Sequence, residues 1–195
     1  MARPQKFERE ELVERAMQVF WAKGYEASSM SDLTGAMGIL SGSLYHIFGG
    51  KKALFLEALK RYDANIQGLF QSSLEKPGTG KDAISRLFVQ VATFLGEDRA
   101  RRGCLLSNTT LACTHPGDAA LKIAESNRSF MENAFFEVLR QSQATGEMRK
   151  RSPGETRVLA QALVNALRGL HITAKTVHDA EKLRQIARAS LEMLS

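Results

Sequence analysis

Residues 24–54 read GYEASSMSDLTGAMGILSGSLYHIFGGKKAL and contain two short runs with helical character. The first run spans residues 30–37 and the second spans residues 41–48, with Gly38 at the start of the turn between them. The pair Gly49-Gly50 then interrupts the second run, as glycine does where a helix ends. The stretch therefore predicts two short helices that meet through a tight turn.

A third helix is expected in front of this pair. Over residues 8–23, apolar side chains recur at three- and four-residue steps, which is the pattern of a helix with one buried face. Gly24 follows in the position of a helix C-cap. Two short helices joined by a tight turn, with a third packed behind them, form a helix-turn-helix, whose second helix enters the major groove of DNA. Residues 41–48 are the expected reading helix.

Helical patterns continue through the rest of the chain, and alternating strand-like runs are almost absent. Each of the four prolines lies where a helix would start or stop. The sequence predicts an all-α protein with an N-terminal three-helix unit over residues 1–50 and a C-terminal bundle over residues 51–195. Further helices are expected at 51–74, which connects the two parts, and at 81–96, 104–114, 117–145, 153–177 and 179–194.

The composition permits a polyanionic partner but does not locate its binding site. The 195 residues carry a net charge of +6, which suits nucleic acid. Residues 1–60 hold eight Lys/Arg and seven Asp/Glu, a net charge of only +1. An architectural DNA binder with a densely basic face is therefore disfavoured, and the DNA-binding hypothesis rests on the helical pattern.

No targeting or membrane segment is evident in the sequence. No apolar run approaches the roughly 18 residues of a membrane span, and the polar first ten residues do not resemble a signal peptide. A cytoplasmic protein with no membrane partner is expected. Cys104 and Cys113 match no zinc spacing and the four histidines do not cluster with them, so neither a metal nor a cofactor is expected.

The reading helix has a small, hydroxyl-rich outer face. Leu44, Ile47 and Phe48 recur at helical spacing and are expected to pack inward. The outward-facing residues are then Ser41, Gly42, Ser43, Tyr45 and His46. Small side chains let the backbone approach DNA, and hydroxyl groups bind phosphate oxygens.

These residues resemble the signature of the TetR family of repressors over residues 8–55. The matching positions are Gly24, Tyr25, Ser28, Ser29, Leu33, Ala36, Gly38, Ile39, Gly42, Ser43, Leu44, Tyr45, Phe48, Lys51 and Leu54. The resemblance implies a homodimer that binds a palindromic double-stranded DNA operator. It also implies a C-terminal domain with the dimer face and a cavity for a small-molecule inducer, whose binding releases the operator.

The resemblance assigns DNA contacts to particular positions. Ser28 or Ser29 matches a phosphate-contacting cap, and Lys51 matches a phosphate-contacting lysine, while Ser41, Gly42, Ser43, Tyr45 and His46 match the groove-facing set. Leu40 departs from the usual Ser or Thr before the reading helix, so Ser41 is expected to act as the cap instead. Arg3 and Lys6 are candidates for a flexible minor-groove arm.

Cys104 admits two readings. Arg101, Arg102 and a helix N-terminus would lower the pKa of its thiol and favour a reactive thiolate, which suits a sensor of electrophiles or oxidants. A Gly-Cys-Leu segment near Asn108 also resembles one TetR subgroup. Alternatively, Cys104 is a small buried residue, the common fate of a free cysteine. An enzyme with Cys104 as nucleophile is disfavoured, because no partnered catalytic constellation accompanies it.

Candidate ligand-lining residues lie on the later helices, although aromatic residues at helical spacing usually pack in the core and most of the candidates are expected to do so. They are Phe88, Phe94, Asn108, Phe130, Phe135 and His171. Arg168 is three residues from His171, so the two are expected to meet an acidic ligand group or an interface. Small and apolar residues over 158–170 and 183–194 suit a twofold helical interface. Repressor and activator polarity both remain open.

Overall fold

The computed structural model describes residues 8–75, 77–98, 101–113 and 118–194. Within these ranges it is an all-α chain, as predicted. The helices are α1 (Arg9–Lys23), α2 (Met30–Met37), α3 (Ser41–Phe48), α4 (Lys51–Leu74), α5 (Gly80–Glu97), α6 (Leu105–Ala112), α7 (Ala119–Ala144), α8 (Pro153–Thr173) and α9 (Ala180–Ala189), followed by a 3₁₀ turn η1 (Ser190–Leu194). No helix among the described residues has the length and apolar character needed to cross a bilayer.

The observed bounds follow local capping chemistry. α2, α3 and α4 begin and end at the predicted residues, and capping boxes open α2, α5 and α8. Two predicted C-terminal bounds were wrong. α8 ends at Thr173 rather than residue 177, and the last helix tightens to 3₁₀ from Ser190.

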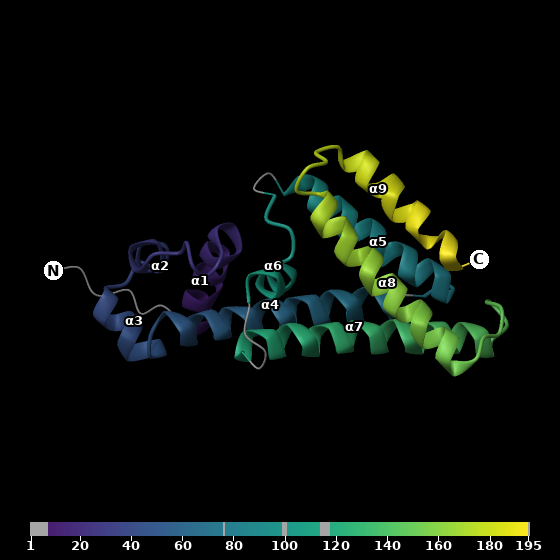
Figure 1. Cartoon of the computed structure of the whole chain (residues 1–195), viewed down its shortest axis with the longest axis horizontal. Coiled ribbons are helices and arrows are strands. Elements are labelled where there is room, and N and C mark those ends of the chain that lie inside the picture. Colours follow the sequence, from purple (N-terminus) through teal and green to yellow (C-terminus); the bar gives the residue numbers. More distant parts are fainter. Residues whose placement is uncertain (1–7, 76, 99–100, 114–117, 195) are drawn as a thin grey trace.

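Two apolar cores lie along the length of the molecule. The first joins α1, α2 and α3 to the first half of α4, to α6 and to the start of α7, and it includes Phe20, Leu33, Leu44 and Leu54. The second lies among α4, α5, α7, α8 and α9. α4 passes from one core to the other, and Figure 1 shows it running beside α7 from the three-helix unit into the bundle. A displacement of α4 would therefore change the packing of both cores.

Several residues considered for the interface or the ligand cavity belong to the second core. Phe88 and Phe135 are fully buried there, so they pack the bundle rather than line an open cavity. Of the apolar positions expected at a twofold interface, the following are buried in the chain's own core: Leu163, Leu170, Leu183, Ala187, Leu191 and Leu194. The exposed apolar side chains on α8 are Val158 and Ile172.

Candidate nucleic-acid interface

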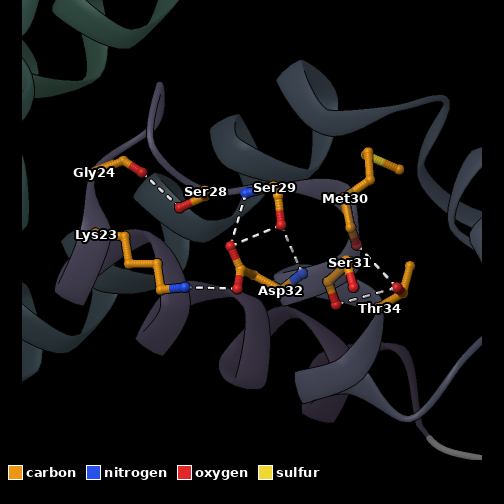
Figure 2. A network of polar contacts seen from close by, with 8 residues as sticks. All are labelled: Lys23, Gly24, Ser28, Ser29, Met30, Ser31, Asp32 and Thr34. Atoms are coloured by element: carbon orange, nitrogen blue, oxygen red, sulfur yellow. Dashed lines mark hydrogen bonds and ion pairs between the residues drawn. The ribbon is translucent and has the colours of Figure 1, made fainter.

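The start of α2 is held by a capping network that also reaches α1 (Figure 2). The Ser29 hydroxyl accepts from the Asp32 amide at 3.0 Å, and the Asp32 carboxylate accepts from the Ser29 amide at 2.9 Å. Lys23 at the end of α1 donates to the same carboxylate at 2.6 Å. The hydrogen bond from Lys23, followed by those from Ser29, holds the pKa of Asp32 well below its ordinary value. The network thus fixes α2 relative to α1.

The two adjacent serines play different parts. Ser29 is the exposed N-cap of α2, in the position expected for a phosphate contact. Ser28 is 1% exposed, and its hydroxyl donates to the Gly24 carbonyl at 2.6 Å. The side chain of Ser28 therefore closes the turn after α1 and faces inward, which corrects its inclusion among the DNA-contacting side chains.

The turn between α2 and α3 depends on Gly38. Its φ of 69° and ψ of 32° lie in the left-handed region, which glycine enters without steric cost. The Gly38 amide donates to the Gly35 carbonyl and the Ile39 amide donates to the Thr34 carbonyl, so these two carbonyl groups near the end of α2 are satisfied. This close turn presents α3 at the surface of the unit.

One side of α3 is buried and the other is open. Leu44 and Phe48 face the first core. Leu40 is 80% exposed and Tyr45 is 58% exposed. Ser41, Gly42 and His46 are exposed, and Ser43 is partly exposed. The structure therefore brings the predicted groove-facing residues together on a single small surface.

The cap of α3 differs from the prediction. Leu40 occupies the N-cap position without a side-chain cap, and Ser41 is the first residue inside the helix. The expectation that Ser41 replaces the cap was therefore wrong, because its position lies one residue too late. The Ser41 hydroxyl remains available, beside first-turn amides that have no partner within the helix.

Lys51 begins α4 close to the start of α2. Its ammonium group lies 4.5 Å from the centroid of the Tyr25 ring and donates to the Glu26 carbonyl at 3.4 Å. Gly50 adopts a φ of 126°, which L side chains rarely reach, so glycine lets the chain turn between α3 and α4. These contacts place one positive charge at the edge of the α2 and α3 surface. Arg3 and Lys6 lie outside the described residues.

Comparison with known proteins supports this geometry. The profile for bacterial regulatory proteins of the tetR family matches residues 12–58. The HTH-type transcriptional repressor ComR of Escherichia coli (strain K12) is 31% identical, over 98% of this chain and 90% of ComR. This chain belongs to the TetR family. The uncharacterised regulator YezE of Bacillus subtilis (strain 168) is 28% identical over the whole of both chains.

A solved TetR-family structure shows the same fold in complex with DNA. A cysteine-substituted form of the regulator CifR, bound to 26-base-pair operator DNA, superposes with a TM-score of 0.87 at 29% identity, over the whole of both chains. TetR membership makes the chain a helix-turn-helix transcriptional regulator, and the matched residues 12–58 contain its α2–α3 surface.

In this TetR-family chain, Trp21 forms a junction between α1 and the loop that precedes α6. The indole N–H of this α1 residue donates to the Gly103 carbonyl at 3.0 Å. The Arg102 guanidinium stacks on the indole ring at 3.9 Å and donates to Gln18 of α1 at 2.6 Å. Asp98 anchors Arg102 from the other side. Sequence reasoning missed this junction, for which the single tryptophan of the chain was the available clue.

Cys104 lies next to the junction, at the N-cap of α6. Its sulfur accepts from the Ser107 amide at 3.5 Å. Burial raises the pKa of Tyr62, and the influence of Cys104 adds to that shift. Arg102, expected to activate the thiol, has its guanidinium bound to Asp98 and Gln18. Asn108 donates to the Arg102 carbonyl at 2.8 Å and accepts from Lys175. Asn108 thus braces the loop before α6.

The two residues of the predicted pair on α8 face different neighbours. The buried His171 lines a cavity with Phe94. Arg168 does not line that cavity, and its charge interacts with Cys104 and with Arg128 and Glu132 of α7. Burial lowers the pKa of Arg168. Phe130 packs against the second core.

Among the described residues, no group of three or more His, Cys, Asp or Glu side chains could hold a metal ion.

Proposed function

We propose that this regulator is a ligand-released repressor that binds a palindromic DNA operator as a homodimer. The observation that carries the proposal is the exposed α3 face, on which Ser41, Tyr45 and His46 lie beside Leu40. Hydroxyl and imidazole groups read base edges and phosphates, while Leu40 suits the methyl group of thymine. Ser29 and Lys51 add phosphate contacts at the edge. The protein works by binding, without catalytic turnover, in the cytoplasm where its operator lies.

The proposal assigns different roles to the two parts of the chain. Residues 1–50 read DNA, α4 connects, and residues 51–195 bind the inducer and the second subunit. ComR is named a transcriptional repressor and CifR is seen on operator DNA, which supports the repressor assignment. Val158 and Ile172 are exposed apolar side chains near the two ends of α8, and a second copy packed along this helix would cover them. Sedimentation over a range of micromolar concentrations tests this interface, and a monomer throughout would contradict it.

A gel shift on the DNA that flanks the protein's own gene tests the DNA-reading role. Wild-type protein is expected to bind a palindromic segment, with an affinity that falls as salt rises. The double variant Ser41→Ala/Ser43→Ala should bind more weakly, because it loses two hydroxyl groups from the surface. Ser72→Ala is the matched control, since its exposed hydroxyl bonds the Leu69 carbonyl far along α4. Equal binding by all three proteins would contradict the assignment of α3.

A second candidate function is electrophile sensing by Cys104, favoured by its half-buried position beside the Trp21 junction. Modification of this sulfur would disturb its contacts with Tyr62 and the start of α6. Release of DNA by an alkylating reagent should then be lost in Cys104→Ser and kept in Cys113→Ser. Retained release in Cys104→Ser would exclude this mode.

An activator of the same fold would show the same binding and opposite transcriptional polarity.

A further inference from the structure

A cavity of about 300 Å³ lies between the DNA-reading unit and the bundle. Its wall includes Trp21 and Gln18 from α1, Tyr62 from α4, Phe94 from α5 and His171 from α8. Four helices from both cores thus contribute to one hollow. Its volume is at the lower end of the range for small-molecule sites, so it would hold one or two fused rings.

One residue of the cavity wall carries an unsatisfied polar atom that is shielded from solvent. His171 is buried, and its Nδ1 has no hydrogen-bond partner in the described structure. A buried nitrogen without a partner is costly, and native proteins rarely keep one without a ligand or water to satisfy it. Burial, opposed in part by the Gly103 carbonyl, lowers the pKa of His171 to about 4. The imidazole is therefore neutral near pH 7 and suited to an uncharged hydrogen-bonding group.

The walls favour a flat apolar ring. The Trp21 and Phe94 rings are nearly parallel, at 18° with centroids 6.1 Å apart, and Tyr62 meets the indole edge-on at 5.0 Å. Phe94 is 47% exposed, so part of its ring is open to a ligand. Aromatic rings gain energy in such offset or edge-to-face arrangements.

The charges around the cavity disfavour an anion. Of the described residues that line it, Glu14 alone carries a charge, and its carboxylate accepts from Arg61 at 3.3 Å and from Gln18 at 2.9 Å. An anionic ligand would meet this carboxylate and find no lysine or arginine on the wall. Arg168, the cation nearest His171 along α8, is not part of the lining.

We propose that this junction cavity binds a small, uncharged aromatic compound that carries one hydroxyl or carbonyl group, with the ring against Trp21 and Phe94 and the polar group paired with His171. The inference rests on the proposed ligand-released function and deepens it. Because the ligand touches α1 directly, its entry would displace Trp21 relative to Arg102 and Gly103, and so tilt the DNA-reading unit.

Calorimetric titration with three naphthalene compounds tests the proposal. 2-Naphthol is neutral with one hydroxyl, naphthalene lacks the polar group, and 2-naphthoate is an anion of similar shape. The full-length wild-type protein is expected to bind 2-naphthol at least about tenfold more tightly than either of the others. Since Trp21 is the single tryptophan of the chain, 2-naphthol should also quench or shift its fluorescence. Absence of 2-naphthol binding, or equal binding of 2-naphthoate, would overturn the proposal.

Variants at His171 separate the polar contact from general packing. His171→Leu should weaken 2-naphthol binding about tenfold and change naphthalene binding much less, while His171→Gln should restore part of the affinity for 2-naphthol. His178→Leu is the matched control, because His178 is exposed and outside the cavity. If His171→Leu does not fold, titration of His171→Gln with the three compounds still tests the contact with His171. Unchanged selectivity at His171 would refute the contact.

Operator binding by the ligand-free protein, measured in parallel, distinguishes a failure of the proposed cavity site from a failure of the proposed repressor function. Loss of the naphthol result with intact operator binding would refute this site alone. Normal naphthol binding without operator binding would refute the repressor function alone.

Discussion

The stability of the protein should depend on pH through His171. Burial, with a smaller contribution from the nearby Arg168 charge, lowers the pKa of this imidazole from 6.5 to about 4 in the folded state. The unfolded chain therefore takes up a proton near pH 6.5 that the folded protein takes up only near pH 4. Because the unfolded state binds more protons between these values, the free energy of unfolding falls as the pH is lowered through this window.

The size of the effect follows from the two pKa values. Between pH 7.5 and pH 5.0, the His171 contribution to the free energy of unfolding should fall by about 2 kcal/mol, and the full loss of about 3 kcal/mol is reached below pH 4. His171→Gln is neutral at both pH values and removes this contribution. Carboxylates with lowered pKa, such as Asp82 and Glu155, lose stability at lower pH in both proteins and cancel in the comparison.

Urea unfolding at fixed protein concentration, followed by circular dichroism, provides the measurement. The difference in unfolding free energy between pH 7.5 and 5.0 should be about 2 kcal/mol smaller in His171→Gln than in the wild type. His178→Gln, which changes an exposed histidine, should behave as the wild type does. Identical pH dependence in wild type and His171→Gln would show that the buried imidazole is not the source.

Three further predictions concern the reading unit and the bundle. Ser29→Ala should lower the free energy of unfolding by about 1 kcal/mol through loss of the α2 cap, while the exposed Ser31→Ala leaves it nearly unchanged in the same urea assay. Gly96→Ala should destabilise by about 1–3 kcal/mol, because the new Cβ would lie 2.4 Å from the Ala180 Cβ. Gly68→Ala, in open space on α4, should instead stabilise by about 0.5–1 kcal/mol, and the opposite order would contradict the α5–α9 packing. Tyr45→Ala should weaken operator binding about tenfold in fluorescence anisotropy without loss of stability, whereas Leu111→Ala, which is also exposed but lies on α6, should not. Equal affinities would remove Tyr45 from the reading surface.

The reading unit was predictable because its determinants are local. Gly38, Gly49 and the Ser29 cap act within a few residues of their own positions, so the sequence pattern carries them directly. The orientation of Ser28 was not predictable, since two adjacent serines compete for the cap and only the packed turn shows which one faces inward. The Leu40 position shows the same limit, because a backbone N-cap does not require a capping side chain.

The bundle and its junction were predictable only in outline. Helical spacing indicates that Phe88 and Phe135 face inward, but it does not show whether an inward-facing ring packs in the core or lines a cavity. The contact between Trp21 and Gly103 joins residues 82 positions apart, and no local pattern encodes such a pairing. His171 and Arg168, three apart on α8, were expected to act together, yet Arg168 interacts with Cys104 and α7 while His171 lines the cavity. Each of these positions depends on tertiary packing, which the local sequence pattern does not encode.

Selection from a random-sequence duplex DNA library with the full-length protein tests the central claim most directly. A homodimer that reads DNA through the α3 face should enrich an inverted repeat of two related half-sites, and the Tyr45→Ala variant should fail to enrich it. Enrichment of no common sequence by the wild type, or of the same repeat by Tyr45→Ala with equal efficiency, would contradict the account.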